Sequence, residues 1–222
     1  MPDKKDDGSG PREKLVETKQ EWARSGRLLT GKDGDPNRDR LPPGQRLVKD
    51  WPVLDLGVTP KIDLEKWRLR IDGAVESRVI WSWDDFLAQP QTGTVSDIHC
   101  VTGWSRYDNR WKGVSAAHVI ACAKPAANAT HCIFYSRDGY TTNVRLDQFA
   151  ADDVLLAHSW NGAPLTAGHG GPLRIIMPRW YFWKSAKWVR RIEFAVDDRP
   201  GYWEVRGYHN EDDPWKEERY DD

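Results

Sequence analysis

The sequence predicts an α+β domain built around a mixed β-sheet. Short apolar or alternating segments, which are typical of strands, outnumber the segments with helical periodicity, and the connections between them are short. The chain contains neither a GxGxxG sequence nor a GxxxxGK[ST] phosphate-binding loop. These absences argue against a doubly wound nucleotide-binding fold.

The chain of 222 residues is expected to form one domain over residues 47–222, preceded by a flexible extension. Residues 1–14 are polar and rich in Gly, Pro, Asp and Lys, so we expect them to be disordered. A short helix is predicted over residues 15–29, which place apolar side chains on one side. Residues 31–44 have the composition of a linker.

In the first half of the domain, residues 67–73 alternate between apolar and polar, which predicts a half-buried strand. Ser82 begins a sequence that resembles a capping box, so a short helix is expected there. Residues 94–98 are expected to be a strand that delivers Cys100 to a loop, and the loop is expected to lead into a helix. Ser115 is the expected N-cap of a helix that runs to residue 123.

The second half of the domain is predicted to be richer in strands. The strands are expected over residues 132–135, 140–144, 154–157, 173–177 and 188–196. The pair Asp138-Gly139 predicts the turn of a hairpin between the first two. A short helix is expected over residues 146–151.

The composition excludes several classes of protein. A net charge of −1 gives no basic surplus for a nucleic-acid partner, and no apolar run approaches the roughly 20 residues of a membrane span. The polar N-terminus does not resemble a secretory signal. The three cysteines have no zinc-like spacing, and their odd number fits a reduced, cytoplasmic protein. The 13 tryptophans indicate a close-packed interior or a lined pocket, without saying which.

Three segments are candidates for function. Cys100 follows a strand and is placed to bind or react, although a cysteine more often simply packs. Residues 169–174 (HGGPLR) combine a histidine and an arginine with two glycines, which allow close approach of the backbone to a ligand. Residues 183–188 (WKSAKW) offer lysine, serine and backbone N–H groups to a phosphate. Taken singly, the second segment could be an ordinary turn and the third a solvated edge.

Taken together and in this order, the three segments resemble the molybdenum-cofactor domain of the sulfite oxidase family. The resemblance extends over residues 48–208 and is strongest to short bacterial members and to the catalytic subunit of periplasmic methionine-sulfoxide reductase. It implies a mixed-sheet molybdopterin-binding fold and a molybdenum–pyranopterin cofactor. It further implies the following contacts: Cys100 to the metal, His169 and Arg174 to the pyranopterin, Ser185, Ala186 and Lys187 to the phosphate, and Leu54 and Asp55 to the cofactor.

The family's chemistry is two-electron oxygen-atom transfer, X + H2O ⇌ XO + 2H+ + 2e−, run in either direction. Sulfite oxidases carry arginines at the positions of Trp104 and Ser105, and a tyrosine beside the metal at the position of His158. We therefore expect a neutral S-oxide or N-oxide as the small-molecule substrate in preference to sulfite. His158 is either a proton donor beside the metal or a core histidine bonded to a carbonyl, and both readings stay open.

Two other functions are compatible with the sequence. The chain could bind or deliver the cofactor without turnover, or it could be an enzyme with Cys100 as nucleophile, activated by His99 or His158. His99 is expected to point away from the metal because strand residues alternate. Cys122 and Cys132 are expected in the core. No haem domain is recognisable, so the resemblance implies a separate electron-transfer partner, and we expect a monomer.

Overall fold

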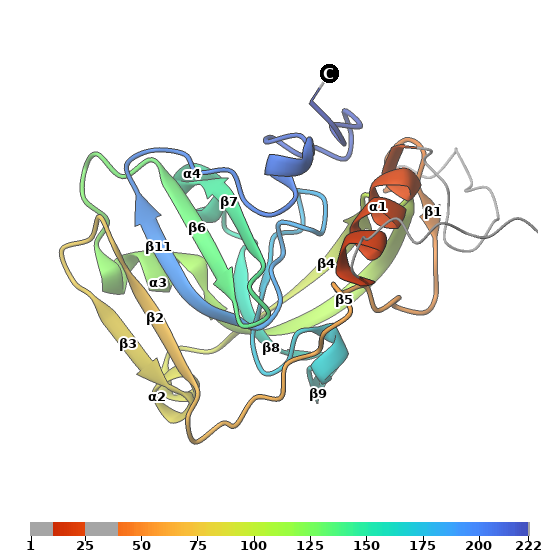
Figure 1. Ribbon diagram of the computed structural model, residues 1–222. Helices are drawn as coiled ribbons and strands as arrows, with labels where there is room; N and C mark the ends of the chain where they lie inside the picture. The colour runs from red at the N-terminus through yellow and green to blue at the C-terminus, as the bar shows by residue number, and fades with distance from the viewer. Residues whose placement is uncertain (1–10, 25–39, 222) are drawn as a thin grey trace, which may run out of the picture.

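The computed structural model describes residues 11–24 and 40–221, which form two β-sheets flanked by short helices (Figure 1). The helices are α1 (Pro11–Arg24), α2 (Trp83–Ala88), α3 (Ala116–Ala123) and α4 (Leu146–Phe149), with 3₁₀ turns at Ala167–His169 and Glu204–Arg206. The strands are β1 (Arg46–Leu47), β2 (Arg68–Gly73), β3 (Val79–Ser82), β4 (Thr92–Cys100), β5 (Trp104–Ser115), β6 (His131–Ser136), β7 (Thr141–Arg145), β8 (Leu155–Trp160), β9 (Ala163–Pro164), β10 (Arg174–Ile176) and β11 (Val189–Ala195).

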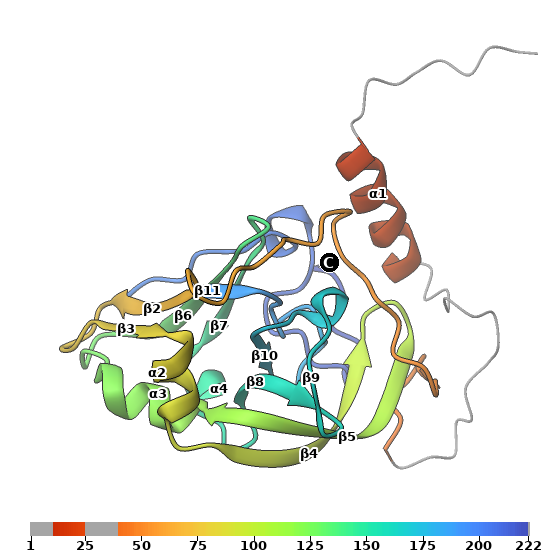
Figure 2. The ribbon, with the colours of Figure 1, turned by 90° about the horizontal axis from the view of Figure 1, so that it is seen from below.

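Both sheets are mixed, which confirms the predicted fold class. In the first sheet, β5 pairs in parallel with β1 and antiparallel with β4 and β8, and β8 also pairs with β9 and β10. The second sheet has the order β3-β2-β11-β6-β7, with β11 parallel to β2 and antiparallel to β6. Figure 2 shows α2 and α3 at one end of the molecule and α1 at the other, beside the long β4–β5 hairpin.

The largest error of the sequence prediction is β5, where we expected a loop. Residues 104–115 are instead a 12-residue strand, and the helix that follows is the predicted one, Ala116–Ala123 with Ser115 as its N-cap. Asn109, Trp111 and Val114 are buried while the intervening charged residues are exposed. The sequence pattern did not indicate this strand because some of its inward-facing residues are polar. The alternation of apolar and polar residues that identifies a half-buried strand is therefore interrupted.

Several tryptophans pack between the second sheet and α2. Trp67 lies edge-on to Trp83, with ring centroids 5.1 Å apart, and both contact the fully buried ring of Phe86. The N-cap Ser82 accepts a hydrogen bond from the backbone N–H of Asp85, which completes the predicted capping box. These contacts account for part of the tryptophan content; other tryptophans line the pocket described below.

The N-terminal helix α1 begins at Pro11, within the segment expected to be disordered. The part of the predicted helix beyond residue 24, and most of the predicted linker, lie outside the described residues. Val16 is buried against the body of the protein, and the segment before the predicted domain start is also anchored, since Gln45 and Arg46 are buried. Among the helices that the structure describes, none has the length and apolar character that a membrane crossing requires.

Candidate functional site

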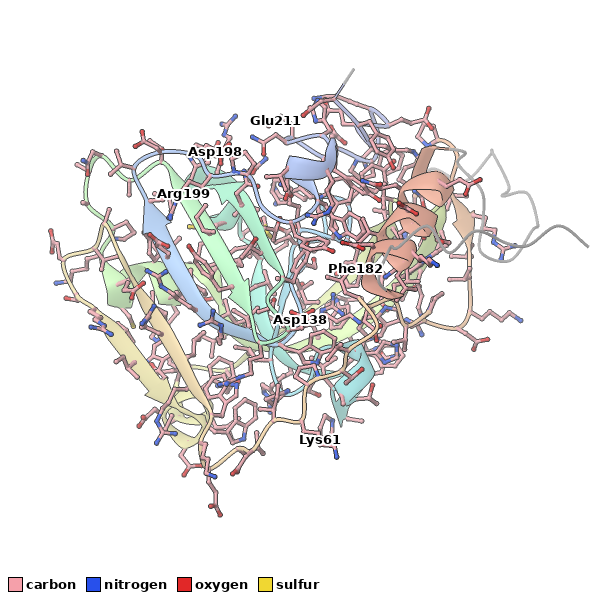
Figure 3. All side chains as sticks on the ribbon, in the orientation of Figure 1. Lys61, Asp138, Phe182, Asp198, Arg199 and Glu211 are labelled. Atoms are coloured by element: carbon pink, nitrogen blue, oxygen red, sulfur yellow. The ribbon has the colours of Figure 1, made fainter. Side chains whose placement is uncertain are left out.

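A pocket of about 850 Å³ brings the three candidate segments together. It is lined by residues from α1, from the segment before β2, from the turn after β4, from the β10–β11 region and from the C-terminal segment. Two lining residues, Asp138 and Phe182, are labelled in Figure 3, in the region between the second sheet and α1.

Backbone pairing between distant segments joins these parts. The N–H of Phe182 donates to the carbonyl of His99 at 2.8 Å, so the segment containing Ser185 is fixed beside the end of β4. An isolated antiparallel bridge pairs Arg174 with Lys187. The turn that carries Cys100 is therefore held against both basic segments.

Cys100 is the last residue of β4 and one wall of the pocket. Its Sγ lies 3.1 Å from the Thr102 hydroxyl. Burial raises the pKa of the Cys100 thiol, partly offset by the hydrogen bonds of Thr102 and by the charges of Lys19 and Arg219. A bound metal ion would deprotonate such a thiol outright.

The surroundings of Cys100 disfavour the cysteine-nucleophile hypothesis. His99 Nδ1 lies 2.8 Å from the Ser105 hydroxyl, and His158 Nε2 lies 3.2 Å from the amide oxygen of Gln91. Neither histidine is hydrogen-bonded to the thiol, and a nucleophilic cysteine requires a lowered pKa, not a raised one. His99 is buried outside the pocket lining, in its expected structural place.

Two cations from the basic segments line the pocket, Arg174 buried and Lys187 half-buried. Arg174 is 1% exposed and donates to the carbonyls of His169 (2.9 Å) and Ser185 (2.8 Å). Lys187 Nζ donates to the carbonyl of Gly168 at 2.6 Å. Burial lowers the pKa of Arg174 to about 9; burial, and then the charge of Arg174, lowers the pKa of Lys187 to about 7. No carboxylate of the described residues forms an ion pair with either cation.

A buried and a half-buried cation without a carboxylate partner fit an anionic ligand, since charges removed from water are otherwise paired. The Ser185 hydroxyl accepts from the N–H of Met177, and its own proton is free to donate to the ligand. The N–H groups of Ser185 and Ala186 donate to protein carbonyls, which leaves the side chains of this segment as the donors available to an anion. Within the described residues no cluster of His, Cys, Asp or Glu could hold a metal ion by itself. The donor set therefore suits a metal whose other ligands come from an anionic cofactor.

His169 is held in a fixed orientation beside these cations. Its Nε2 lies 3.0 Å from the Trp51 carbonyl, its Nδ1 lies 2.9 Å from the Thr166 hydroxyl, and its ring stacks on that of Trp51 at 4.0 Å. Because the Trp51 carbonyl can only accept a hydrogen bond, the proton of the neutral ring is on Nε2. The adjacent glycines are required by the protein's own packing: a Cβ on Gly171 would lie 2.2 Å from the carbonyl of Leu165.

Of the four predicted catalytic residues, Cys100 and Trp104 line the pocket, whereas Ser105 and His158 lie outside it. The indole N–H of Trp104 is buried and has no partner among the described residues. Ser105 faces the other way, because neighbours in a strand alternate, and is buried beside His99 and Gln45. His158 packs against Trp83 and Phe86, so its reading as a core histidine is favoured, with Gln91 in place of a carbonyl as its partner.

The other predicted residues reach the pocket, together with some that the sequence did not indicate. Leu54, Asp55, His169, Arg174, Ser185, Ala186 and Lys187 all line it. The unanticipated lining includes Lys19 of α1 and aromatic residues such as Trp51, Trp183 and Trp203. Cys132 is buried as expected and Cys122 is half-buried; all three cysteines are free.

Comparisons with known proteins agree with this geometry. Residues 56–203 match the family model described as the oxidoreductase molybdopterin binding domain. The chain is 45% identical over 182 residues to an uncharacterized oxidoreductase, YuiH, of Bacillus subtilis, covering 82% of this chain and 92% of that protein. It is 27% identical over 155 residues to the protein-methionine-sulfoxide reductase catalytic subunit MsrP of Ralstonia nicotianae, covering 63% of this chain and 46% of that protein.

A solved structure shows the same fold. The sulfane dehydrogenase SoxCD from Paracoccus pantotrophus superposes with a TM-score of 0.58 at 23% identity, over 63% of this chain and 40% of that one. The family match covers well over half of the chain and confirms both the predicted molybdenum–molybdopterin cofactor and the predicted class of enzyme. The chain belongs to the oxidoreductase molybdopterin-binding domain family, and it is a molybdopterin-dependent oxidoreductase of the sulfite oxidase type.

Proposed function

We propose that the protein reduces a neutral S-oxide or N-oxide at a molybdenum ion ligated by Cys100. The observation that carries this proposal is the position of Trp104, which lines the pocket beside Cys100 where an oxyanion-binding enzyme would need a cation. Trp203 and Tyr208 extend the aromatic lining. A site of this kind suits a substrate without net charge better than it suits sulfite.

The arginine nearest in sequence does not supply the missing charge. Arg106 Nε donates to the carbonyl of Lys49 at 3.1 Å, and its guanidinium lies 4.8 Å from the ring centroid of Trp160. Arg106 does not line the pocket. Of the cations that do line it, Arg174 and Lys187 belong to the proposed phosphate end, and Lys19 donates to the carbonyl of Asp55.

Each of the proposed site residues has its own role in binding the cofactor or the substrate. The cofactor, when bound, supplies the two-electron chemistry of the reaction XO + 2H+ + 2e− → X + H2O. Cys100 supplies the soft thiolate for the metal. Arg174, Lys187 and the Ser185 hydroxyl hold the phosphate, and His169, fixed by Trp51, contacts the pterin. The aromatic lining excludes water and orients the substrate.

The electrons are proposed to come from a separate partner. The methionine-sulfoxide reductase relatives are named as subunits, which supports a donor outside the catalytic chain. The reduced state of Cys100, Cys122 and Cys132 supports the proposal of a cytoplasmic protein. A monomeric state remains a prediction.

A comparison of two substrates tests the proposal. We expect kcat/KM for methionine sulfoxide or dimethyl sulfoxide with reduced viologen to exceed that for sulfite with ferricyanide by at least tenfold, about 1.4 kcal/mol of transition-state stabilisation. Trp104→Arg should move this ratio towards sulfite, whereas Trp104→Phe should not. A tenfold preference of the wild-type enzyme for sulfite would contradict the proposal.

A further inference from the structure

The N-terminal helix α1 forms part of the pocket wall. Lys19 lines the pocket together with Asp55, Cys100 and Lys187, although more than thirty residues separate it from the nearest of them in sequence. Its Nζ donates to the backbone carbonyl of Asp55, in the segment that the sequence indicates for cofactor contact.

Helix α1 is attached to the rim of the pocket on two sides. On one side, Leu15 packs so closely on Gly57 that a Cβ there would lie 2.9 Å from a Leu15 methyl group. On the other side, the hydroxyl of Tyr220 donates to the carbonyl of Gln20 at 2.7 Å, and the Gln20 amide donates to the carbonyl of Arg206 at 3.1 Å. The helix therefore bridges the segment before β2 and the C-terminal segment.

The charge of Lys19 is unbalanced in this position. No carboxylate of the described residues forms an ion pair with its ammonium group; the Asp55 carboxylate, whose charge acts on Lys19, accepts from the N–H of Gly57 at 2.8 Å. Burial lowers the pKa of Lys19, against smaller opposing effects of Asp55 and Cys100. An ammonium group has three protons, and the bond to the Asp55 carbonyl uses one. The remaining donors are suited to an anion inside the pocket.

We propose that Lys19 is a further cofactor-binding residue, and that α1 holds the molybdenum cofactor in the pocket through it. The proposal rests on the cofactor assignment. It makes Lys19 the third cation of the site, beside Arg174 and Lys187, and the only one of the three contributed from outside residues 56–203. It follows that α1 is ordered by the bound cofactor and that the cofactor leaves faster when Lys19 cannot bind it.

The test measures cofactor retention, not activity. Full-length protein, purified with its cofactor, is dialysed, and the molybdenum and pterin remaining are measured over time. Lys19→Met keeps the apolar stem of the side chain and removes the charge; we expect it to lose the cofactor at least fivefold faster than the wild type. Lys19→Arg should restore at least half of the lost retention time. Lys14→Met, on the exposed side of the same helix, is the matched control and should behave as wild type.

A second measurement needs no variant. Amide hydrogen exchange in α1 should be at least fivefold slower in the loaded wild-type protein than in the cofactor-free protein. Equal retention by Lys19→Met and wild type, equal losses in Lys19→Met and Lys14→Met, or unchanged exchange in α1 would each overturn the proposal. Wild-type protein that contains no molybdenum or pterin would instead refute the cofactor assignment, so the two failures are distinguishable.

Discussion

At the scale of single residues, the site is organised by charges that lack protein partners. Arg174 is buried and Lys187 half-buried; both donate only to carbonyl groups and have lowered pKa values. Such an arrangement costs folding free energy in the absence of a ligand, because each buried charge is poorly compensated. The cost indicates that the site is built for an anion.

Removing either cation should weaken cofactor binding more than it weakens the fold. Truncating the buried partner of an anion costs about 2–5 kcal/mol of binding free energy. We expect Arg174→Ala and Lys187→Ala to be purified with a small fraction of the wild-type molybdenum content. Arg179→Ala, which breaks only the exposed ion pairs with Asp152 and Asp153, should keep full occupancy. Wild-type occupancy in both pocket variants would show that the anion binds elsewhere.

Lys187 should also give the cofactor-free protein a distinct pH dependence. Its pKa is about 7 when folded, against about 10.4 in an unfolded chain. Between these values the unfolded state binds a proton that the folded state does not, so stability rises with pH, by up to about 1.4 kcal/mol per unit. Below pH 7 both states are protonated and the full penalty remains.

Comparison with Lys187→Met isolates this contribution from that of other titrating groups. We expect the variant to be more stable than the wild type at pH 7, and the difference to shrink towards pH 10. Free energies of unfolding in urea at pH 7, 8, 9 and 10 provide the measurement. A difference that stays constant over this range would mean that Lys187 is not desolvated in the folded protein.

The resemblance to a family, carried by three segments in a fixed order, predicted most of the residues that line the pocket. Cys100, His169, Arg174 and Lys187 all reach the pocket. The sequence left two readings of His158 open because its direction depends on how β8 packs against α2, which no local pattern reveals.

At the scale of elements, β5 determines how the first sheet is assembled. It pairs with three other strands, and its register with β8 shifts between Lys112 and Gly113. A Cβ on Gly113 would lie 1.9 Å from the carbonyl of Leu156, so the two backbones approach as closely as glycine permits. The sequence could not predict this contact, because the requirement for glycine comes from a strand more than forty residues away.

Gly113→Ala should therefore destabilise the protein by about 1–3 kcal/mol, the usual cost of forcing extra atoms into a packed region. Gly93→Ala, in the paired strand β4, is the matched control, because its Cβ would meet only the carbonyl of Trp111 at 3.3 Å. Urea unfolding of both variants gives the comparison. Equal stabilities would show that the β5–β8 contact is looser than the structure describes.

Helix α1 illustrates a different limit of prediction. Its buried face contains Val16 and Lys19 with a half-buried Gln20, so it lacks the broad apolar stripe by which a packed helix is identified. The helix is located mainly by polar contacts to the Asp55 segment and the C-terminal segment. Those partners are distant in sequence, and only the folded chain brings them together.

At the scale of the whole molecule, the pocket depends on segments from nearly the full length of the described chain. Lys19 and Tyr208 both line it, and Cys100 lies between them in sequence. The fold class was predictable because short strands and tight turns are local features. The assembly of the pocket was predictable only through the resemblance to a family, since the pairing of Phe182 with His99 leaves no local trace.

The central claim is that Cys100 ligates the molybdenum ion of a pyranopterin cofactor in this pocket. X-ray absorption at the molybdenum edge of purified wild-type protein and of Cys100→Ser tests it most directly. The other cofactor contacts lie elsewhere, so the variant should retain its fold and at least half of its pterin. Its molybdenum should have one sulfur ligand fewer than that of the wild type, and oxygen-atom transfer should be lost. The same number of sulfur ligands in both proteins would contradict the claim.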